Sequence, residues 1–193
     1  MINRRNFILG TTLASFLSYF GIKASIGKRI PNPMNVKKTS SPMVVSTWNH
    51  GLAANEAAWE VIKNGGKAID AVETGVRIPE GDPEVNSVGY GGYPDREGNV
   101  TLDACIMDEI GNCGSVSFLQ NIKHPISVAR KVMDETPHVM LSGAGALKFA
   151  LANGFKEEVL LTEKSKKAWR DWLKTSKYAP IINRENHDTI GLL

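Results

Sequence analysis

The sequence predicts a mixed α/β (α+β) fold in which helices cover a sheet. One observation is the hydrophobic pattern: short β-branched or alternating runs are interspersed with segments whose apolar residues recur at helical spacing. Another is composition: of the 193 residues, 42% are hydrophobic and 22% are charged, which excludes a disordered chain or a fibre. The length suits one domain once a leader is removed.

Residues 1–24 have the features of an export signal. Arg4 and Arg5 precede Asn6–Leu9 and a moderately apolar run to Ile22, which is typical of a twin-arginine signal. An uncleaved membrane anchor is the alternative, because the run ends in a poor small-residue cleavage site. We expect export to a bacterial periplasm, with membrane contact only through this signal.

Residues 25–42 form a predicted linker, since they contain prolines and lysines but few large apolar side chains. The net charge of the whole chain is only +3, and much of it lies in the leader and this linker. We therefore expect no nucleic-acid surface.

A buried strand over Met43–Trp48 and then two helices are predicted to begin the folded part. Apolar residues at helical spacing define the inner face of each helix: Ala58, Val61 and Ile62 in the first, and Ile69, Val72 and Val76 in the second. Gly65–Gly66 should end the first helix. Asp70 and Glu73 are expected to be solvated charges. From composition alone, Trp48 is more often a core residue than a ligand contact.

Residues 79–98 are rich in glycine, proline and acids, and predict a loop with sharp turns. A nucleotide site is not expected, because Ser87–Gly92 lacks a Gly-Lys-Ser/Thr ending and opens no helix. Residues 100–108 alternate and should form a hairpin with residues 114–119, turning near Ile110–Gly111. We interpret Asp103 and Asp108 as structural.

Cys105 and Cys113 fall on the two strands of this hairpin, at positions that would not face each other. We interpret both as small packing residues. Neither has the further Cys or His spacing of a metal site.

Three helices and a short strand are predicted in the next part of the chain. The segments are a helix beginning at Pro125 with Ile126, Ala129, Val132 and Met133 inward, a strand over 138–141, a helix ending near Gly154 and a helix over 162–176. The last helix has an inner stripe that includes Trp169 and Trp172. These tryptophans suggest either a carbohydrate platform or core packing, and helical spacing favours the core.

His187, Asp188 and Thr189 carry the chemistry. A threonine hydroxyl held against the preceding carbonyl can add to it, so Asp188–Thr189 is a candidate self-cleavage bond, with Asp188 and His187 assisting. Cleavage would leave Thr189 as an amino terminus whose α-amine, with a pKa of about 7.7–8.0, can act as its base. The alternative is a polar turn leading into a strand that begins at Thr189.

Four sequence blocks, in order, resemble the amino-terminal part of glycosylasparaginases (aspartylglucosaminidases), which are amino-terminal-nucleophile hydrolases. The blocks are Val45–Asn49, Gly65–Glu73, Ser87–Asp95 with Thr101–Asp108, and His187–Gly191. The likeness runs from about Met43 to Leu193. Asp188 favours this branch, because the related plant-type asparaginases and isoaspartyl peptidases usually have glycine before the threonine.

The resemblance implies a four-layer αββα sandwich, with two antiparallel sheets between helical layers, that is incomplete here. Residues 43–188 would form the first (α) subunit and residues 189–193 the start of the second (β) subunit. We expect the chain alone to show neither efficient self-cleavage nor turnover, because the truncated strand leaves sheet edges and apolar helix faces uncovered.

The implied reaction is hydrolysis of the amide bond between asparagine and N-acetylglucosamine in glycoasparagines, with Thr189 as nucleophile. Trp48 would contact the aspartyl part of the substrate, and Asn49 is a weaker binding candidate. No metal or organic cofactor is expected. The implied partners are the glycoasparagine and the chain's own second subunit, as a dimer of αβ units. The alternatives are an asparaginase or isoaspartyl peptidase of the same superfamily, and an inactive truncated fragment.

Overall fold

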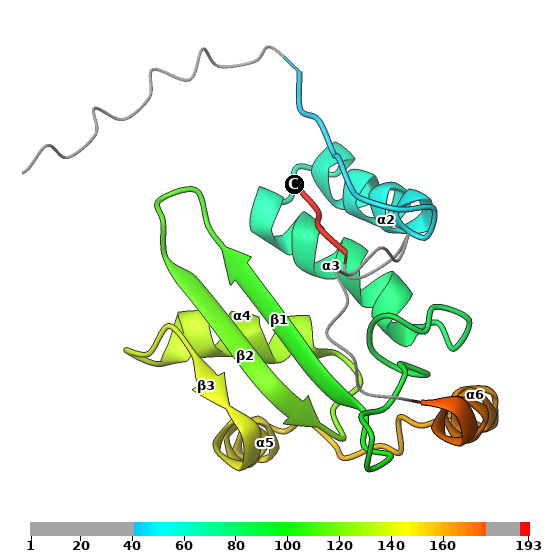
Figure 1. Ribbon diagram of the computed structural model, residues 1–193. Coiled ribbons are helices and arrows are strands. Elements are labelled where there is room, and N and C mark those ends of the chain that lie inside the picture. Colours follow the sequence, from blue (N-terminus) through cyan, green and yellow to red (C-terminus); the bar gives the residue numbers. More distant parts are fainter. Residues whose placement is uncertain (1–40, 177–189) are drawn as a thin grey trace, which may run out of the picture. The chain divides into compact units, whose positions relative to one another are not determined.

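The computed structural model describes residues 41–176 and 190–193 (Figure 1). The elements are α2 (Gly51–Lys63), α3 (Ala68–Gly81), β1 (Thr101–Met107), β2 (Cys113–Gln120), α4 (Pro125–Glu135), β3 (Leu141–Ser142), α5 (Gly143–Ala152) and α6 (Glu163–Thr175). This order of helices and strands confirms the predicted α/β class. None of the helices within the described residues is long and apolar enough to cross a membrane.

The described residues form one sheet of three strands, in the order β1-β2-β3. β1 and β2 are the predicted antiparallel hairpin, and β3 lies parallel to β2. α4 lies against the hairpin (Figure 1), and the opposite face of the hairpin exposes Met107 and Phe118. The two-sheet sandwich implied by the resemblance is therefore only partly represented in the described residues.

Asp103 and Asp108 both shape the hairpin. Asp103 lies at a bulge in the pairing of β1 with β2, where its carboxylate accepts the N–H of Phe118 at 2.8 Å. Asp108 accepts the N–H groups of Ile110 at 3.0 Å and Asn112 at 2.8 Å across the turn. Desolvation acts to raise the pKa of Asp108, but the Asn112 side-chain amide, which donates at 2.7 Å, and these backbone N–H groups outweigh it and lower the pKa. The interpretation of both aspartates as structural is confirmed.

Cys105 and Cys113 lie opposite Ser115 and Met107 respectively, so they do not face each other, and both thiols are free. Both are nevertheless exposed. Their interpretation as packing residues is wrong, because alternation along β1 puts Cys105 on the face that α4 does not cover.

Helix α2 ends as predicted. Gly65 has φ +80°, and the N–H groups of Gly65 and Gly66 donate to the carbonyls of Ile62 and Val61, both at 2.9 Å. This pair of hydrogen bonds satisfies the last carbonyls of the helix, and the left-handed conformation costs glycine little.

Helix α3 continues past the expected loop start at Pro79 and ends at Gly81. The loop itself supports this last turn, since the N–H of Tyr90 donates to the Glu80 carbonyl at 2.8 Å. Gly89, with φ +58°, permits this close approach: a Cβ there would lie 2.1 Å from the same carbonyl oxygen. The prediction that glycines allow sharp turns in this segment is confirmed.

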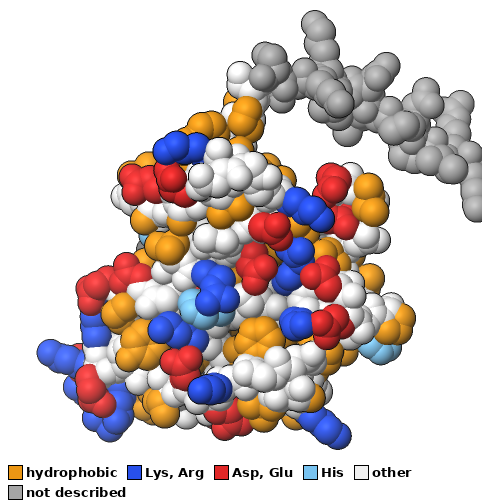
Figure 2. Space-filling model, turned by 180° about the vertical axis from the view of Figure 1, so that it is seen from behind, with side chains coloured by type: hydrophobic (Ala, Val, Ile, Leu, Met, Phe, Trp, Pro, Cys, Tyr) orange, Lys and Arg blue, Asp and Glu red, His pale blue; other side chains and the backbone are white. Residues whose placement is uncertain are grey.

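Asp70 and Glu73 join α3 to α4 and are not simply solvated. The Ser127 hydroxyl donates to Glu73 at 2.7 Å, and Arg130 lies 3.2 Å from Asp70 and 3.8 Å from Glu73. Arg77 donates to the Ser127 hydroxyl at 3.0 Å. Figure 2 shows acidic and basic side chains intermingled on the side of the molecule where α4 lies. The expectation of solvated charges is wrong because α4, about 50 residues farther along, presents partners to both.

Glu80, in the last turn of α3, is a buried acid that meets the start of α4, and its side chain is only 3% exposed. It accepts the N–H of Ile126 at 3.0 Å and lies 3.3 Å from Nδ1 of His124. Burial raises the pKa of Glu80 well above its ordinary value, although the Ile126 N–H and Arg77 oppose this. Partial burial, with Arg77 and Lys123 nearby, lowers the pKa of His124 to about 4. The two side chains thus join the end of α3 to the start of α4 through a contact whose Glu80 side is buried and whose His124 side is half-buried.

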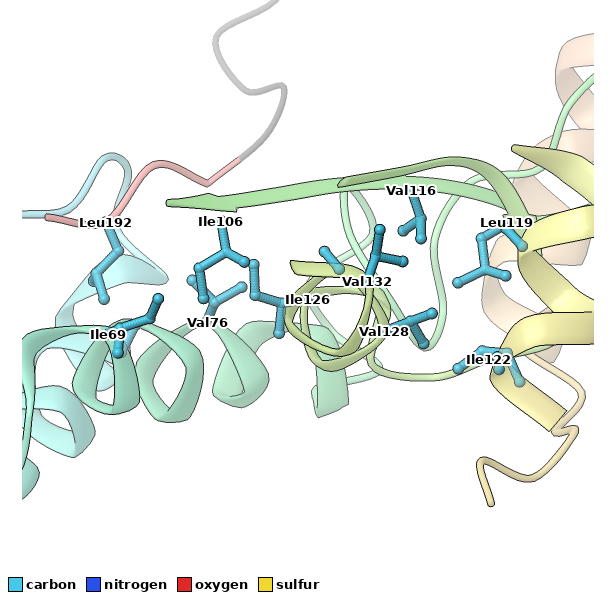
Figure 3. Close-up of a cluster of buried hydrophobic side chains, with 14 of the residues drawn as sticks. Ile69, Val76, Ile106, Val116, Leu119, Ile122, Ile126, Val128, Val132 and Leu192 are labelled. Atoms are coloured by element: carbon cyan, nitrogen blue, oxygen red, sulfur yellow. The ribbon is translucent and has the colours of Figure 1, made fainter. Parts of the chain in front are cut away.

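The main hydrophobic core lies between the hairpin and the helices α3 and α4 (Figure 3). The buried residues labelled in Figure 3 are Ile69, Val76, Ile106, Val116, Leu119, Ile122, Ile126, Val128, Val132 and Leu192. Ile69, Val76, Ile126 and Val132 occupy the inner helix faces predicted from helical spacing, and Ile106 lies on an inner face of the alternating strand β1. Leu192 comes from the far end of the chain and lies next to Ile69 in this view.

Two elements differ from their prediction. β3 starts at Leu141, where the expected strand ends, because Leu141 and not the preceding residues pairs with Val116 of β2. α6 contacts the loop before β1 through Ser165 and Trp169, and Trp172 remains 51% exposed, with the Arg96 guanidinium 5.7 Å from its ring centroid. Trp169 donates to the Arg96 carbonyl at 3.2 Å. The prediction that Trp172 packs in the core is wrong.

Candidate active site

The segment before α2 pairs with the end of the chain. Val45 and Leu193 exchange two backbone hydrogen bonds of 2.9 and 2.8 Å, and Ser46 bridges Leu192 in antiparallel orientation. The N–H of Thr47 then donates to the Gly191 carbonyl at 3.0 Å. We call this pairing of residues 45–47 with residues 191–193 the terminal ladder. The predicted buried strand over Met43–Trp48 is wrong: Ser46 makes only an isolated bridge, flanked by the hydrogen bonds of Val45 and Thr47, and Met43 and Val45 are exposed.

Leu192 anchors the terminal ladder to the core. Its side chain is 9% exposed and belongs to the main core. A Cβ on Gly75 of α3 would lie 3.0 Å from Leu192 Cδ2, so the absence of a side chain at Gly75 makes room for it. The end of the chain is thus held by apolar contacts as well as by hydrogen bonds (Figures 1 and 3).

Trp48 turns the chain out of the terminal ladder. It has φ +63°, a left-handed conformation that is rare for a bulky residue and costs about 1–2 kcal/mol. Its carbonyl accepts the N–H of Gly51 at 3.1 Å, so the turn leads directly into α2. Its side chain is 44% exposed, so Trp48 is not a core tryptophan. Backbone strain of this kind is concentrated at functional sites in proteins.

Asn49 is also exposed, and its carbonyl accepts the N–H of Leu52 at 3.2 Å in the first turn of α2. The Ser46 hydroxyl closes the turn from the other side by donating to the Gly51 carbonyl at 3.0 Å. Gly51 is required here, since a Cβ would lie 2.2 Å from the Ser46 Oγ. Trp48 and Asn49 are therefore held between two fixed points of the backbone.

His187, Asp188 and Thr189, the predicted self-cleavage residues, lie outside the described residues. The described part of the chain resumes at Ile190, the residue after Thr189. In the terminal ladder, Thr47 is hydrogen-bonded to Gly191, which lies two residues after Thr189 in the sequence. Trp48 is the residue next to Thr47, so it adjoins this pairing. Within the described residues, no three His, Cys, Asp or Glu side chains converge on a possible metal position.

One contact was not anticipated from the sequence. The N–H of Gly191 donates to the Thr47 side-chain oxygen, Oγ1, at 3.0 Å. The sequence block that contains Trp48 and Asn49 gave no signal for Thr47, because no local pattern reveals a hydroxyl whose partner is 144 residues away. The buried Glu80 and its partner His124 were missed for the same reason.

The fold and site define a class: an α/β domain whose terminal ladder joins a strained, exposed tryptophan to the segment that follows a predicted threonine nucleophile. Residues 34–190 match the asparaginase family, and the chain belongs to this family. The resemblance inferred from the sequence blocks is thereby confirmed.

Relatives in this family extend the comparison. The chain is 58% identical over 191 residues to N(4)-(β-N-acetylglucosaminyl)-L-asparaginase of Elizabethkingia miricola, an alignment that covers 99% of this chain and 56% of the relative. It is 46% identical over 133 residues to the protein of the same name from Rattus norvegicus, covering 68% of this chain and 38% of that relative. The chain thus spans about half, or less, of the length of these relatives.

Proposed function

We propose that the chain is the amino-terminal part of a self-cleaving amidohydrolase that hydrolyses the N4-(β-N-acetylglucosaminyl)-L-asparagine amide bond of glycoasparagines. The observation that carries this proposal is the 58% identity, over nearly the whole chain, to a protein named for that activity. The terminal ladder supports it, since it brings the exposed Trp48 next to the segment that continues from Thr189.

Self-cleavage begins with attack of the Thr189 hydroxyl oxygen on the Asp188 carbonyl carbon. The peptide C–N bond breaks, the acyl group moves to oxygen, and the nitrogen becomes a free α-amine. Water then hydrolyses the ester and releases Asp188 as a new carboxyl terminus. Asp188 and His187 assist the cleavage through proton transfer or by holding the peptide strained.

Turnover uses the new amino terminus. The α-amine of Thr189 takes the hydroxyl proton while the oxygen attacks the side-chain carbonyl of the substrate asparagine, which gives a β-aspartyl ester and expels the amino sugar with a proton. Water hydrolyses the ester and releases aspartate. Trp48, with Asn49 as a second candidate, contacts the aspartyl part. This chemistry requires no metal or organic cofactor, because nucleophile and base are on one residue.

The test is the intact mass of the protein expressed from the complete reading frame, beside a Thr189→Ala variant. We expect two chains that meet between Asp188 and Thr189 in the parent, and a single uncut chain in the variant. An uncut parent would contradict the proposal. Activity of the cleaved protein on a glycoasparagine, compared with asparagine and β-aspartyl dipeptides, separates this function from an asparaginase or isoaspartyl peptidase.

Export and assembly are part of the same proposal. The twin arginines Arg4 and Arg5 support export to the periplasm, and the family resemblance supports a dimer of αβ units. Replacing both arginines by lysine should retain the precursor in the cytoplasm, and an unchanged periplasmic yield would argue against this signal. Light scattering of the cleaved protein measures the assembly, and a mass of one αβ unit would argue against the dimer.

A further inference from the structure

We propose that the hydroxyl of Thr47 is a positioning group that sets the register of the segment carrying Thr189. The inference rests on the proposed function, because it assigns to Thr47 a task in the chemistry of Thr189. The supporting observation is the hydrogen bonding of the last pair of residues in the terminal ladder, Thr47 and Gly191.

The last rung of the terminal ladder is irregular. In an antiparallel pair, two hydrogen-bonded residues exchange both N–H···O=C bonds, as Val45 and Leu193 do. Two residues along each chain, Thr47 and Gly191 should do the same. The Thr47 N–H does donate to the Gly191 carbonyl at 3.0 Å, but the Gly191 N–H donates to Thr47 Oγ1, also at 3.0 Å. A side-chain oxygen has replaced a backbone carbonyl in this rung.

The reason lies in the next residue. Trp48 has φ +63°, so the backbone leaves the ladder direction immediately after Thr47. The Ser46 hydroxyl and the N–H of Gly51 hold this turn, through the Gly51 and Trp48 carbonyls respectively. When the chain turns outward at Trp48, the regular hydrogen bond from the Gly191 N–H to the Thr47 carbonyl is lost. The Thr47 hydroxyl oxygen accepts from the Gly191 N–H in its place.

The position of this bond makes it relevant to the chemistry. Among the ladder bonds between residues 45–47 and 191–193, it involves the donor closest in sequence to Thr189, and it is the one made by a side chain. Two residues of extended chain span at most about 7 Å. A fixed Gly191 N–H thus limits the range of Thr189, and after cleavage Thr189 is tethered only through Ile190 and Gly191.

The substitution that tests the hydroxyl is Thr47→Val in the complete reading frame, because valine keeps the shape but removes the acceptor. Thr47→Ser restores it. We expect the first-order rate of self-cleavage to fall about 10- to 100-fold in Thr47→Val, the loss typical of a misplaced reacting group, and to stay near the parent in Thr47→Ser. In cleaved protein, kcat on a glycoasparagine should fall by a similar factor with KM little changed.

The matched control is Thr136→Val, which makes the same chemical change at the end of α4. The Thr136 hydroxyl donates to the Val132 carbonyl at 2.8 Å and takes no part in the terminal ladder. Its self-cleavage rate should equal that of the parent. Thermal unfolding of all variants shows whether a lost rate merely follows a lost fold.

A Thr47→Val protein that cleaves and turns over like the parent would overturn the inference. If Thr47→Val does not fold, the series Ser, Cys and Ala at position 47 decides: rates that fall in this order of acceptor strength support it, and rates that follow only the melting temperature contradict it. The proposed function fails separately, through an uncut parent or a cleaving Thr189→Ala variant.

Discussion

At the scale of single residues, the buried Glu80 and the half-buried His124 form a pair whose pKa shifts change stability with pH in opposite directions. In the folded protein the pKa of His124 lies at about 4, against 6.5 in the unfolded chain. The unfolded state therefore binds more protons between these values, and this residue lowers stability as the pH falls from 6.5 to 4. Glu80 has a raised pKa, so its contribution is largest at low pH and is lost as the pH rises above 4.5.

This pair predicts a difference between variants. His124→Asn should lose less stability than the parent as the pH is lowered from 6.5 to 4.5, because the unfolded variant has no imidazole to protonate. The check is the urea midpoint of unfolding at several pH values in this window. His138→Asn, at an exposed histidine, is the control and should parallel the parent. Parallel curves for all three proteins would show that the burial of His124 has no energetic consequence.

At the scale of elements, α5 contains a glycine without a structural task. A Cβ on Gly145 would meet no atom within 4 Å, whereas a Cβ on Gly89 would lie 2.1 Å from the Glu80 carbonyl oxygen. Gly145 therefore contributes only the helix-destabilising flexibility of glycine. Gly89 instead supplies a left-handed turn that an L side chain strains.

Gly145→Ala should raise the free energy of unfolding by about 0.5–1 kcal/mol, the usual gain of alanine over glycine in a helix. Gly89→Ala should lower it by about 1–3 kcal/mol through strain alone, and by more through overlap. Chemical denaturation of both variants measures the two effects. An equal response at the two positions would contradict the distinction drawn from their surroundings.

At the scale of the whole domain, Leu192 links the end of the chain to the core that the hairpin, α3 and α4 share. Leu192 lies close to Gly75 of α3 and shares the core cluster with Ile69, which lies next to it in Figure 3, so these neighbours help to place the segment after the predicted nucleophile. Local register and global packing are coupled at this point. Loss of the apolar anchor should loosen the terminal ladder even though every hydrogen-bonding group remains.

Leu192→Ala should destabilise the protein by about 2–5 kcal/mol and slow self-cleavage, because it leaves a cavity under the ladder. Leu52→Ala, at an exposed position of α2, should change stability by less than about 0.5 kcal/mol and leave cleavage unchanged. Denaturant unfolding and the time course of chain cleavage measure both. A Leu192→Ala protein that is destabilised but cleaves at the parental rate would show that the packing of Leu192 does not affect self-cleavage.

The sequence by itself determined the features whose causes lie within a few residues. Alternation predicted the hairpin, Gly65–Gly66 predicted the end of α2, and Pro125 the start of α4. The order of sequence blocks identified the asparaginase family and selected Trp48 and Asn49 as site candidates. The roles of His187, Asp188 and Thr189 remain predictions, because these residues lie outside the described part of the chain.

Only the tertiary structure decided which residues pack against each face of a helix or strand. Periodicity marks a face as apolar or polar but does not identify its partner. It could not reveal that Glu73 accepts a hydrogen bond from Ser127, or that Trp172 stays half-exposed beside Arg96. The contact of Thr47 with Gly191 joins residues 144 positions apart. This hydrogen bond forms because the backbone leaves the terminal ladder at Trp48. That departure is a property of the packed chain and not of any short segment.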